Sequence, residues 1–165
     1  MTAREILAPG GVPIQMTCTP TGPELCFDAT DNNCNGVIDE GCGVETGALQ
    51  FAIAWPEGAD VDLDVTDPRG ELAKPGERTG SGLAKDRDCG RPENVCHGQN
   101  MENVFFAGER PRPGRYRVEI KLDKPDEVRF PVKVRFGGRV GVKTFSLDVE
   151  LASPEDTKAF AFVIE

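Results

Sequence analysis

Apolar residues occupy every second position through most of residues 48–165, and this alternation constrains the fold more than any other feature of the sequence. In residues 60–65, for example, three aspartates alternate with Val61, Leu63 and Val65. Strict alternation gives a strand one buried and one solvated face, which is typical of antiparallel sheets. The 19 glycines and 13 prolines supply turns between short strands and argue against a helix bundle. We therefore predict a mostly β chain in which residues 48–165 form an antiparallel β-sandwich of about seven strands.

The alternation is interrupted at three places. Phe136 and Arg139 flank a Gly-Gly pair, so we expect a two-residue hairpin turn there. The apolar phase changes between Val142 and Phe145, which predicts a β-bulge. Residues 68–103 are polar and glycine-rich, so we expect a long loop that is mostly without strands.

Six cysteines, an even number, predict disulfides formed in an oxidising compartment. Seven residues separate each of the first four, a spacing that fits no common zinc site, and the only histidine, His97, cannot complete one. The alternative is a cytosolic protein with reduced thiols. We expect the last two to form one disulfide that holds the long loop, whereas three pairings stay open for the first four. The expected disulfide residues are Cys18, Cys26, Cys34, Cys42, Cys89 and Cys96.

Charge and hydropathy exclude two classes of partner. The net charge is −9 and the isoelectric point about 4.7, which argues against nucleic acid, and no apolar run is long enough to insert into a membrane. The N-terminal residues lack the apolar segment of a signal peptide. We therefore expect a signal or lipoprotein anchor that is absent from this chain, and a secreted, periplasmic or cell-surface location.

The chain divides into three parts. Residues 1–17 show little pattern, and we expect a tether. Residues 18–43, here called the leader, hold four cysteines but few large apolar side chains, so disulfides or a metal must stabilise their shape. Residues 48–165 form the predicted sandwich.

The leader contains the sequence of an EF-hand-like calcium loop over residues 31–40. Alternate oxygen-bearing side chains at loop positions 1, 3 and 5 can converge on one hard cation, Gly36 permits the sharp turn at position 6, and position 7 offers a carbonyl. Position 12, normally a bidentate glutamate, is Cys42, so Glu40 or Asp28 must supply that oxygen unless water does. The predicted ligands of Ca²⁺ are Asp31, Asn33, Asn35, Val37, Asp39 and Glu40.

Two asparagines in place of aspartates lower the charge of this loop. We therefore expect weak affinity, with a dissociation constant on the order of 10⁻⁴ to 10⁻³ M, and calcium in preference to magnesium. The alternative is a set of Asx-turns in a disulfide knot, where asparagine and aspartate serve turn formation alone.

The segment CFDATDNNCNGVIDEGC, residues 26–42, resembles a metal-binding-motif repeat of secreted bacterial proteins, especially large myxobacterial ones. The resemblance covers residues 18–43 and implies secretion and calcium. Asn33 and Asn35 depart from the aspartates usual in the repeat, and Phe27-Asp28-Ala29 replaces the usual Asp-Gly.

The second part of the chain is similar to YfaP-like domains of bacterial surface and periplasmic proteins, and in layout to pre-peptidase C-terminal sandwiches. The resemblance implies a jelly-roll-like sandwich used for binding or structure, without known catalysis. It rests on Trp55, residues 59–65, residues 67–70, residues 102–104 and residues 113–118.

A second, weaker metal site is expected on the sandwich. Asp60, Asp62 and Asp64 share one face of a predicted strand, and like charges at this spacing repel unless a cation or basic side chains lie nearby. Glu102 and Asn103 are candidates to meet them, which gives Asp60, Asp62 and Glu102 as a possible site. The alternative is a solvated strand face balanced by lysines and arginines.

We expect no catalysis, because the sequence lacks a phosphate-binding glycine loop and a nucleophile elbow, and has a single histidine. The predicted function is a secreted or cell-surface calcium-binding module whose sandwich binds a protein or glycan at the cell surface. The alternative is a structural subunit of an extracellular assembly, such as a filament, coat or envelope appendage, built from this chain alone or with other subunits.

Overall fold

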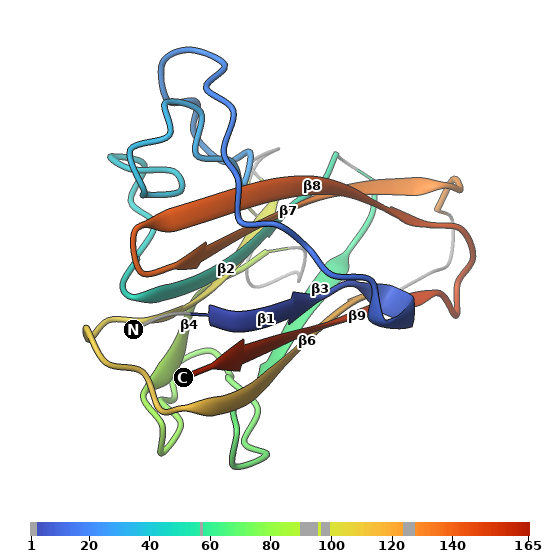
Figure 1. Cartoon of the computed structure of the whole chain (residues 1–165). Coiled ribbons are helices and arrows are strands. Elements are labelled where there is room, and N and C mark those ends of the chain that lie inside the picture. Colours follow the sequence, from blue (N-terminus) through green and yellow to red (C-terminus); the bar gives the residue numbers. More distant parts are fainter. Residues whose placement is uncertain (1–2, 57, 90–95, 97–99, 124–127) are drawn as a thin grey trace.

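The computed structural model describes residues 3–56, 58–89, 96, 100–123 and 128–165 (Figure 1). This part of the chain is almost entirely β-structure, with one short 3₁₀ turn, η1 (Pro9–Gly11). Its strands are β1 (Ala3–Leu7), β2 (Leu49–Ala54), β3 (Val61–Thr66), β4 (Leu83–Asp88), β5 (Met101–Phe106), β6 (Gly114–Leu122), β7 (Val132–Val140), β8 (Lys143–Leu151) and β9 (Thr157–Ile164). None of its helical structure has the length and hydrophobicity that a bilayer span requires.

The strands form two sheets in which every pair of neighbours is antiparallel. The four-stranded sheet has the order β1-β9-β6-β3, and the five-stranded sheet has the order β4-β5-β2-β7-β8. Alternation along the strands buries one face of each sheet against the other, as the pattern of β3 illustrates. The predicted antiparallel sandwich is confirmed.

Phenylalanine rings fill the space between the sheets. The five rings contact one another with centroid separations between 4.8 and 6.3 Å. Such pairs contribute roughly 0.5–1.5 kcal/mol each beyond the burial of apolar area. The rings belong to Phe51, Phe136, Phe145, Phe160 and Phe162.

The leader lies on the outer face of the five-stranded sheet, beyond β7 and β8 (blue to cyan in Figure 1). A small second apolar cluster joins the two parts. Ala29 and Ile38 of the leader are fully buried there against Ala52 and Ala54 of β2 and Met101 of β5. The leader therefore borrows a core from the sandwich that its own few apolar residues cannot provide.

The structure places one strand within each of two segments that were predicted to be a tether and a mostly strandless loop. Within the expected tether of residues 1–17, Ala3–Leu7 form β1, which pairs with β9 at the edge of the four-stranded sheet. Within the expected loop of residues 68–103, Leu83–Asp88 form β4, which pairs with β5. Both strands were missed because they lack clean alternation: only Ile6 of β1 is buried, and β4 is rich in charge. The parts of the predicted loop at 90–95 and 97–99 lie outside the described residues.

The predicted hairpin at the Gly-Gly pair is wrong. Gly137 and Gly138 lie inside β7, and the chain turns at Gly141 and Val142, so the expected bulge is this turn. Both glycines lie where a neighbouring group approaches the backbone closely. A Cβ on Gly137 would lie 2.0 Å from the carbonyl oxygen of Ala29, and a Cβ on Gly138 would lie 2.4 Å from a ring carbon of Phe145 in β8.

Candidate metal centre

Two disulfides brace the leader from both sides. Cys18 is bonded to Cys34 and Cys26 to Cys42, each over 16 positions of sequence, and none of the six cysteines is free. Cys89 is bonded to Cys96, as predicted. The structure thus selects one of the three pairings that the sequence left open.

Residues 31–40, the predicted calcium loop, contain a series of side-chain-to-backbone hydrogen bonds. Asp31 accepts the N–H of Asn35 at Oδ1 (3.2 Å) and the N–H of Gly36 at Oδ2 (2.9 Å). Asn33 Oδ1 accepts the same Asn35 N–H (3.2 Å), and Asn35 Oδ1 accepts the N–H of Val37 (3.1 Å). The Asx-turns of the alternative interpretation are therefore present. The Oδ1 atoms of Asp31, Asn33 and Asn35 each keep a second lone pair, so the turns leave these side chains able to bind a cation.

Glu40 closes the open side of this loop. Its Oε1 accepts a hydrogen bond from Asn33 Nδ2 at 2.9 Å, and hydrogen bonds from Asn33 and Asn35 hold the pKa of this carboxyl below its ordinary value. Its backbone N–H donates to Glu24 Oε2 (3.3 Å). Of the two replacements considered for loop position 12, Glu40 is therefore the one beside the position 3 and 5 side chains.

Asp39 points to the interior instead. Its side chain is fully buried, Oδ2 accepts the N–H of Ala29 (3.3 Å), and Oδ1 has no hydrogen bond within the described part of the chain. Burial and the neighbouring Asp28 carboxyl raise the pKa of Asp39 to about 8. Asp28 itself accepts the Thr30 N–H (3.1 Å) and an amide N–H of Asn32 (2.9 Å). The structure thus separates Asp39, which is buried beside Asp28, from Asn33, Asn35 and Glu40, whose side chains hydrogen-bond to one another.

The oxygen ligands that this loop offers fit a hard cation. Carboxylate and amide oxygens, which Asp31, Asn33, Asn35 and Glu40 carry, are ligands that Ca²⁺ takes. The thiols that a softer metal would use are all committed to disulfides.

Residues 16–40 match a family model described as "Putative metal-binding motif". The name of that family, Cu-binding MopE, refers to copper, and its match covers most of the leader and none of the sandwich. No curated protein and no solved structure matches the chain. The metal-binding-motif resemblance is confirmed, whereas the similarity of the sandwich to YfaP-like domains stays a prediction.

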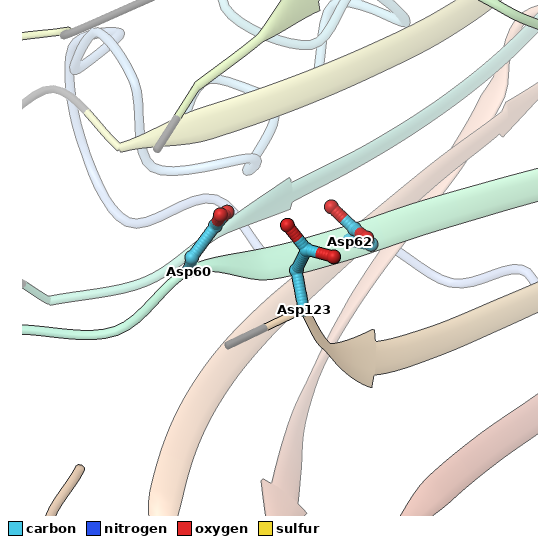
Figure 2. A group of neighbouring side chains, drawn as sticks. All are labelled: Asp60, Asp62 and Asp123. Atoms are coloured by element: carbon cyan, nitrogen blue, oxygen red, sulfur yellow. The ribbon is translucent and has the colours of Figure 1, made fainter. Parts of the chain in front are cut away.

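The second predicted site is regrouped by the fold. Asp60 and Asp62 point toward Asp123, which follows β6, and carboxylate oxygens of the three lie within 4.8 Å of one another (Figure 2). Asp60 is buried rather than exposed. Burial of Asp62, together with the nearby carboxylates of Asp123 and Asp60, raises the pKa of Asp62 to about 6. The sequence pattern did not indicate Asp123, because it comes close only when β3 pairs with β6, with Val61 opposite Leu122.

Glu102 meets Asp62 in a different group, together with Asp88. Glu102 and Lys85 form a buried ion pair, with Nζ and Oε1 2.8 Å apart. The pair also bonds the free edge of β3: Leu63 donates its N–H to Glu102 Oε2 (2.9 Å), and its carbonyl accepts from Lys85 Nζ (3.0 Å). We call Lys85 and Glu102 the edge pair.

The predicted balance of the strand face by basic side chains holds in part. Lys121 of β6 pairs with Asp62 in the register of β3 and β6, and its ammonium lies 2.9 Å from a carboxylate oxygen of Asp64, the diagonal neighbour. Asn103 serves another purpose, since its amide accepts from Gln50 and donates to Asp86 and to the carbonyl of Glu45.

Proposed function

We propose that this chain is a non-catalytic calcium-binding module of an extracellular protein. The observation that carries the proposal is the convergence of the Asn33, Asn35 and Glu40 side chains on one loop mouth, with Asp31 tied into the same loop. Two disulfides hold this loop before any ion arrives. Preorganisation of this kind lowers the ordering cost of binding.

Calcium suits this site better than copper does. Copper favours imidazole, thiolate and thioether ligands, whereas the loop offers carboxylate, amide and carbonyl oxygens. Magnesium demands stricter octahedral geometry and keeps more of its water. We expect a calcium dissociation constant on the order of 10⁻⁴ to 10⁻³ M, which matches extracellular calcium.

Three disulfides favour an oxidising compartment, which supports a secreted or surface-attached protein. In this setting calcium holds the leader rigid on the five-stranded sheet. The sandwich then presents a fixed surface to a protein or glycan at the cell surface.

The test is calorimetric titration of the non-reduced chain with calcium, magnesium and copper. Glu40→Gln should weaken calcium binding at least tenfold, while Glu150→Gln, the same change at an exposed position of β8, should leave it unchanged. Asp123→Asn should also leave the loop's binding unchanged, which separates the loop from the cluster in Figure 2. Absence of binding at millimolar calcium, or equal losses in the two glutamine variants, would overturn the proposal.

A further inference from the structure

The first residue of the calcium loop is held by the sandwich as well as by the loop. Asp31 is 2% exposed, and its Oδ2 accepts a hydrogen bond of 2.8 Å from Thr144 Oγ1 in addition to the one from Gly36 N–H. Thr144 is 4% exposed and lies 113 positions later, near the start of β8. A buried donor therefore fixes the orientation of a carboxylate that the loop presents at position 1.

The loop and the β7–β8 turn touch at the backbone. A Cβ on Gly36 would lie 2.8 Å from the carbonyl oxygen of Val142, so only glycine permits this approach. Across the same hairpin, Thr144 pairs with Arg139; burial lowers the pKa of the Arg139 guanidinium, and the nearby Asp31 carboxylate opposes this shift. Two residues of one cross-strand pair thus act on the position 1 ligand.

A separate contact on the same strand joins leader and sandwich without involving the loop. The hydroxyl of Ser146, two residues after Thr144 and therefore on the same face of β8, lies 3.0 Å from that of Thr30. Arg135 Nε donates to the same Thr30 hydroxyl (3.2 Å). This contact provides a control, because it docks the leader but touches none of the predicted calcium ligands.

We infer that Thr144 is a positioning residue for the calcium site, so that the sandwich sets the affinity of the loop. The inference rests on the calcium role proposed above. A donor that bonds one carboxylate oxygen orients the other toward the ion, and loss of such outer partners typically weakens metal binding about 10- to 100-fold. The matched motif ends at residue 40, so the metal site extends beyond the sequence segment that marks it.

The experiment compares three variants of the 165-residue, disulfide-bonded chain by calorimetric titration with calcium chloride. Thr144→Val keeps the shape but removes the donor, and should weaken calcium binding about 10- to 100-fold. Thr144→Ser keeps the hydroxyl and should bind within about threefold of the unmodified chain, since the donor remains. Ser146→Ala removes the neighbouring contact and should also leave the affinity unchanged. Thermal melts in excess chelator establish that each variant is folded before titration.

The outcomes separate this inference from the proposed function. If the unmodified chain binds calcium and Thr144→Val binds equally well, the positioning role is overturned and the calcium function stands. If Ser146→Ala or Thr144→Ser loses as much affinity as Thr144→Val, docking or packing rather than the Asp31 hydrogen bond is responsible, and the positioning role is again overturned. If the unmodified chain binds no calcium, both the function and the inference fail.

Discussion

The edge pair, Lys85 and Glu102, gives the sharpest test of what holds the two sheets together. β3 is an edge strand, and its backbone groups at Leu63 are satisfied by these side chains rather than by another strand. Unpaired strand edges are a liability that proteins cover or charge. Replacing Lys85 by methionine keeps the length of the side chain but removes the ammonium that bonds both Glu102 and the Leu63 carbonyl.

The structure sets the size of the effect. The side chains of Lys85 and Glu102 are 6% and 0% exposed, and removing one partner of a buried ion pair costs roughly 3–5 kcal/mol. Burial and the nearby Asp88 carboxyl raise the pKa of Glu102, so this group can take up a proton once the lysine is gone, which limits the charge penalty. We therefore expect Lys85→Met to lower the free energy of unfolding by about 3 kcal/mol.

Urea denaturation followed by the fluorescence of Trp55, the single tryptophan, measures this loss. Trp55 is 6% exposed and its indole N–H donates to the carbonyl of Ala59 (2.8 Å), so unfolding changes its surroundings. Lys121→Met is the matched control: its ion pair with Asp64 is 41% and 26% exposed, and such pairs contribute about 0–1 kcal/mol. If Lys85→Met costs no more than Lys121→Met, the edge pair does not stabilise β3 and the reasoning is wrong.

Three further predictions test other parts of the molecule. Gly137→Ala should displace the leader, because its Cβ would overlap the Ala29 carbonyl oxygen, and hydrogen exchange should rise in residues 18–43 while the sandwich core stays protected. Asp62→Asn should raise the free energy of unfolding at pH 7 by about 1 kcal/mol after discounting for partial exposure. The pKa of Asp62 is about 6 in the folded protein, above its ordinary value, so the stability that its protonation contributes is fully present below pH 4 and is lost as the pH rises through 6. Urea titrations in chelator at pH 4 and pH 7 should therefore show a smaller decline in the free energy of unfolding for the variant than for the unmodified chain. Replacing Cys26 and Cys42 together by serine should lower calcium affinity in calorimetric titrations without unfolding the sandwich, because their disulfide restricts the loop between them. Unchanged affinity would show that this disulfide does not preorganise the site.

The sandwich could be predicted because period-two alternation reports local geometry. Each alternating segment fixes which of its faces is buried, and together these faces require two opposed sheets. β1 was not predicted because five residues with a single buried side chain show no recognisable alternation. The Gly-Gly pair was wrongly predicted to form a turn, because glycine serves both in turns and where another backbone group comes close. Only the position of Ala29 in the folded protein decides between these two roles.

The candidate site was predictable to the extent that it is local. Loop positions 1, 3, 5 and 6 follow from spacing alone, and so does the presence of disulfides. The inward turn of Asp39 depends on Asp28 and on burial by the sheet, which spacing does not encode. The contact between Asp31 and Thr144 depends on how the leader docks on the sandwich. In the same way, the cluster of Asp60, Asp62 and Asp123 depends on the pairing of β3 with β6.

On the proposed function, docking gives a physical reason why a loop with two asparagines binds calcium. Asn33 and Asn35 reduce the electrostatic attraction that aspartates would supply, so the affinity must come from geometry. Two disulfides and the Thr144 hydroxyl fix the loop in advance, so little conformational entropy remains to be lost when the ion binds. Because linkage is reciprocal, an ion that gains affinity from the docked leader must in turn stabilise docking by the same free energy. On the proposed function, calcium at millimolar concentration thus adds to the apolar contacts and hydrogen bonds that already hold the leader on the five-stranded sheet.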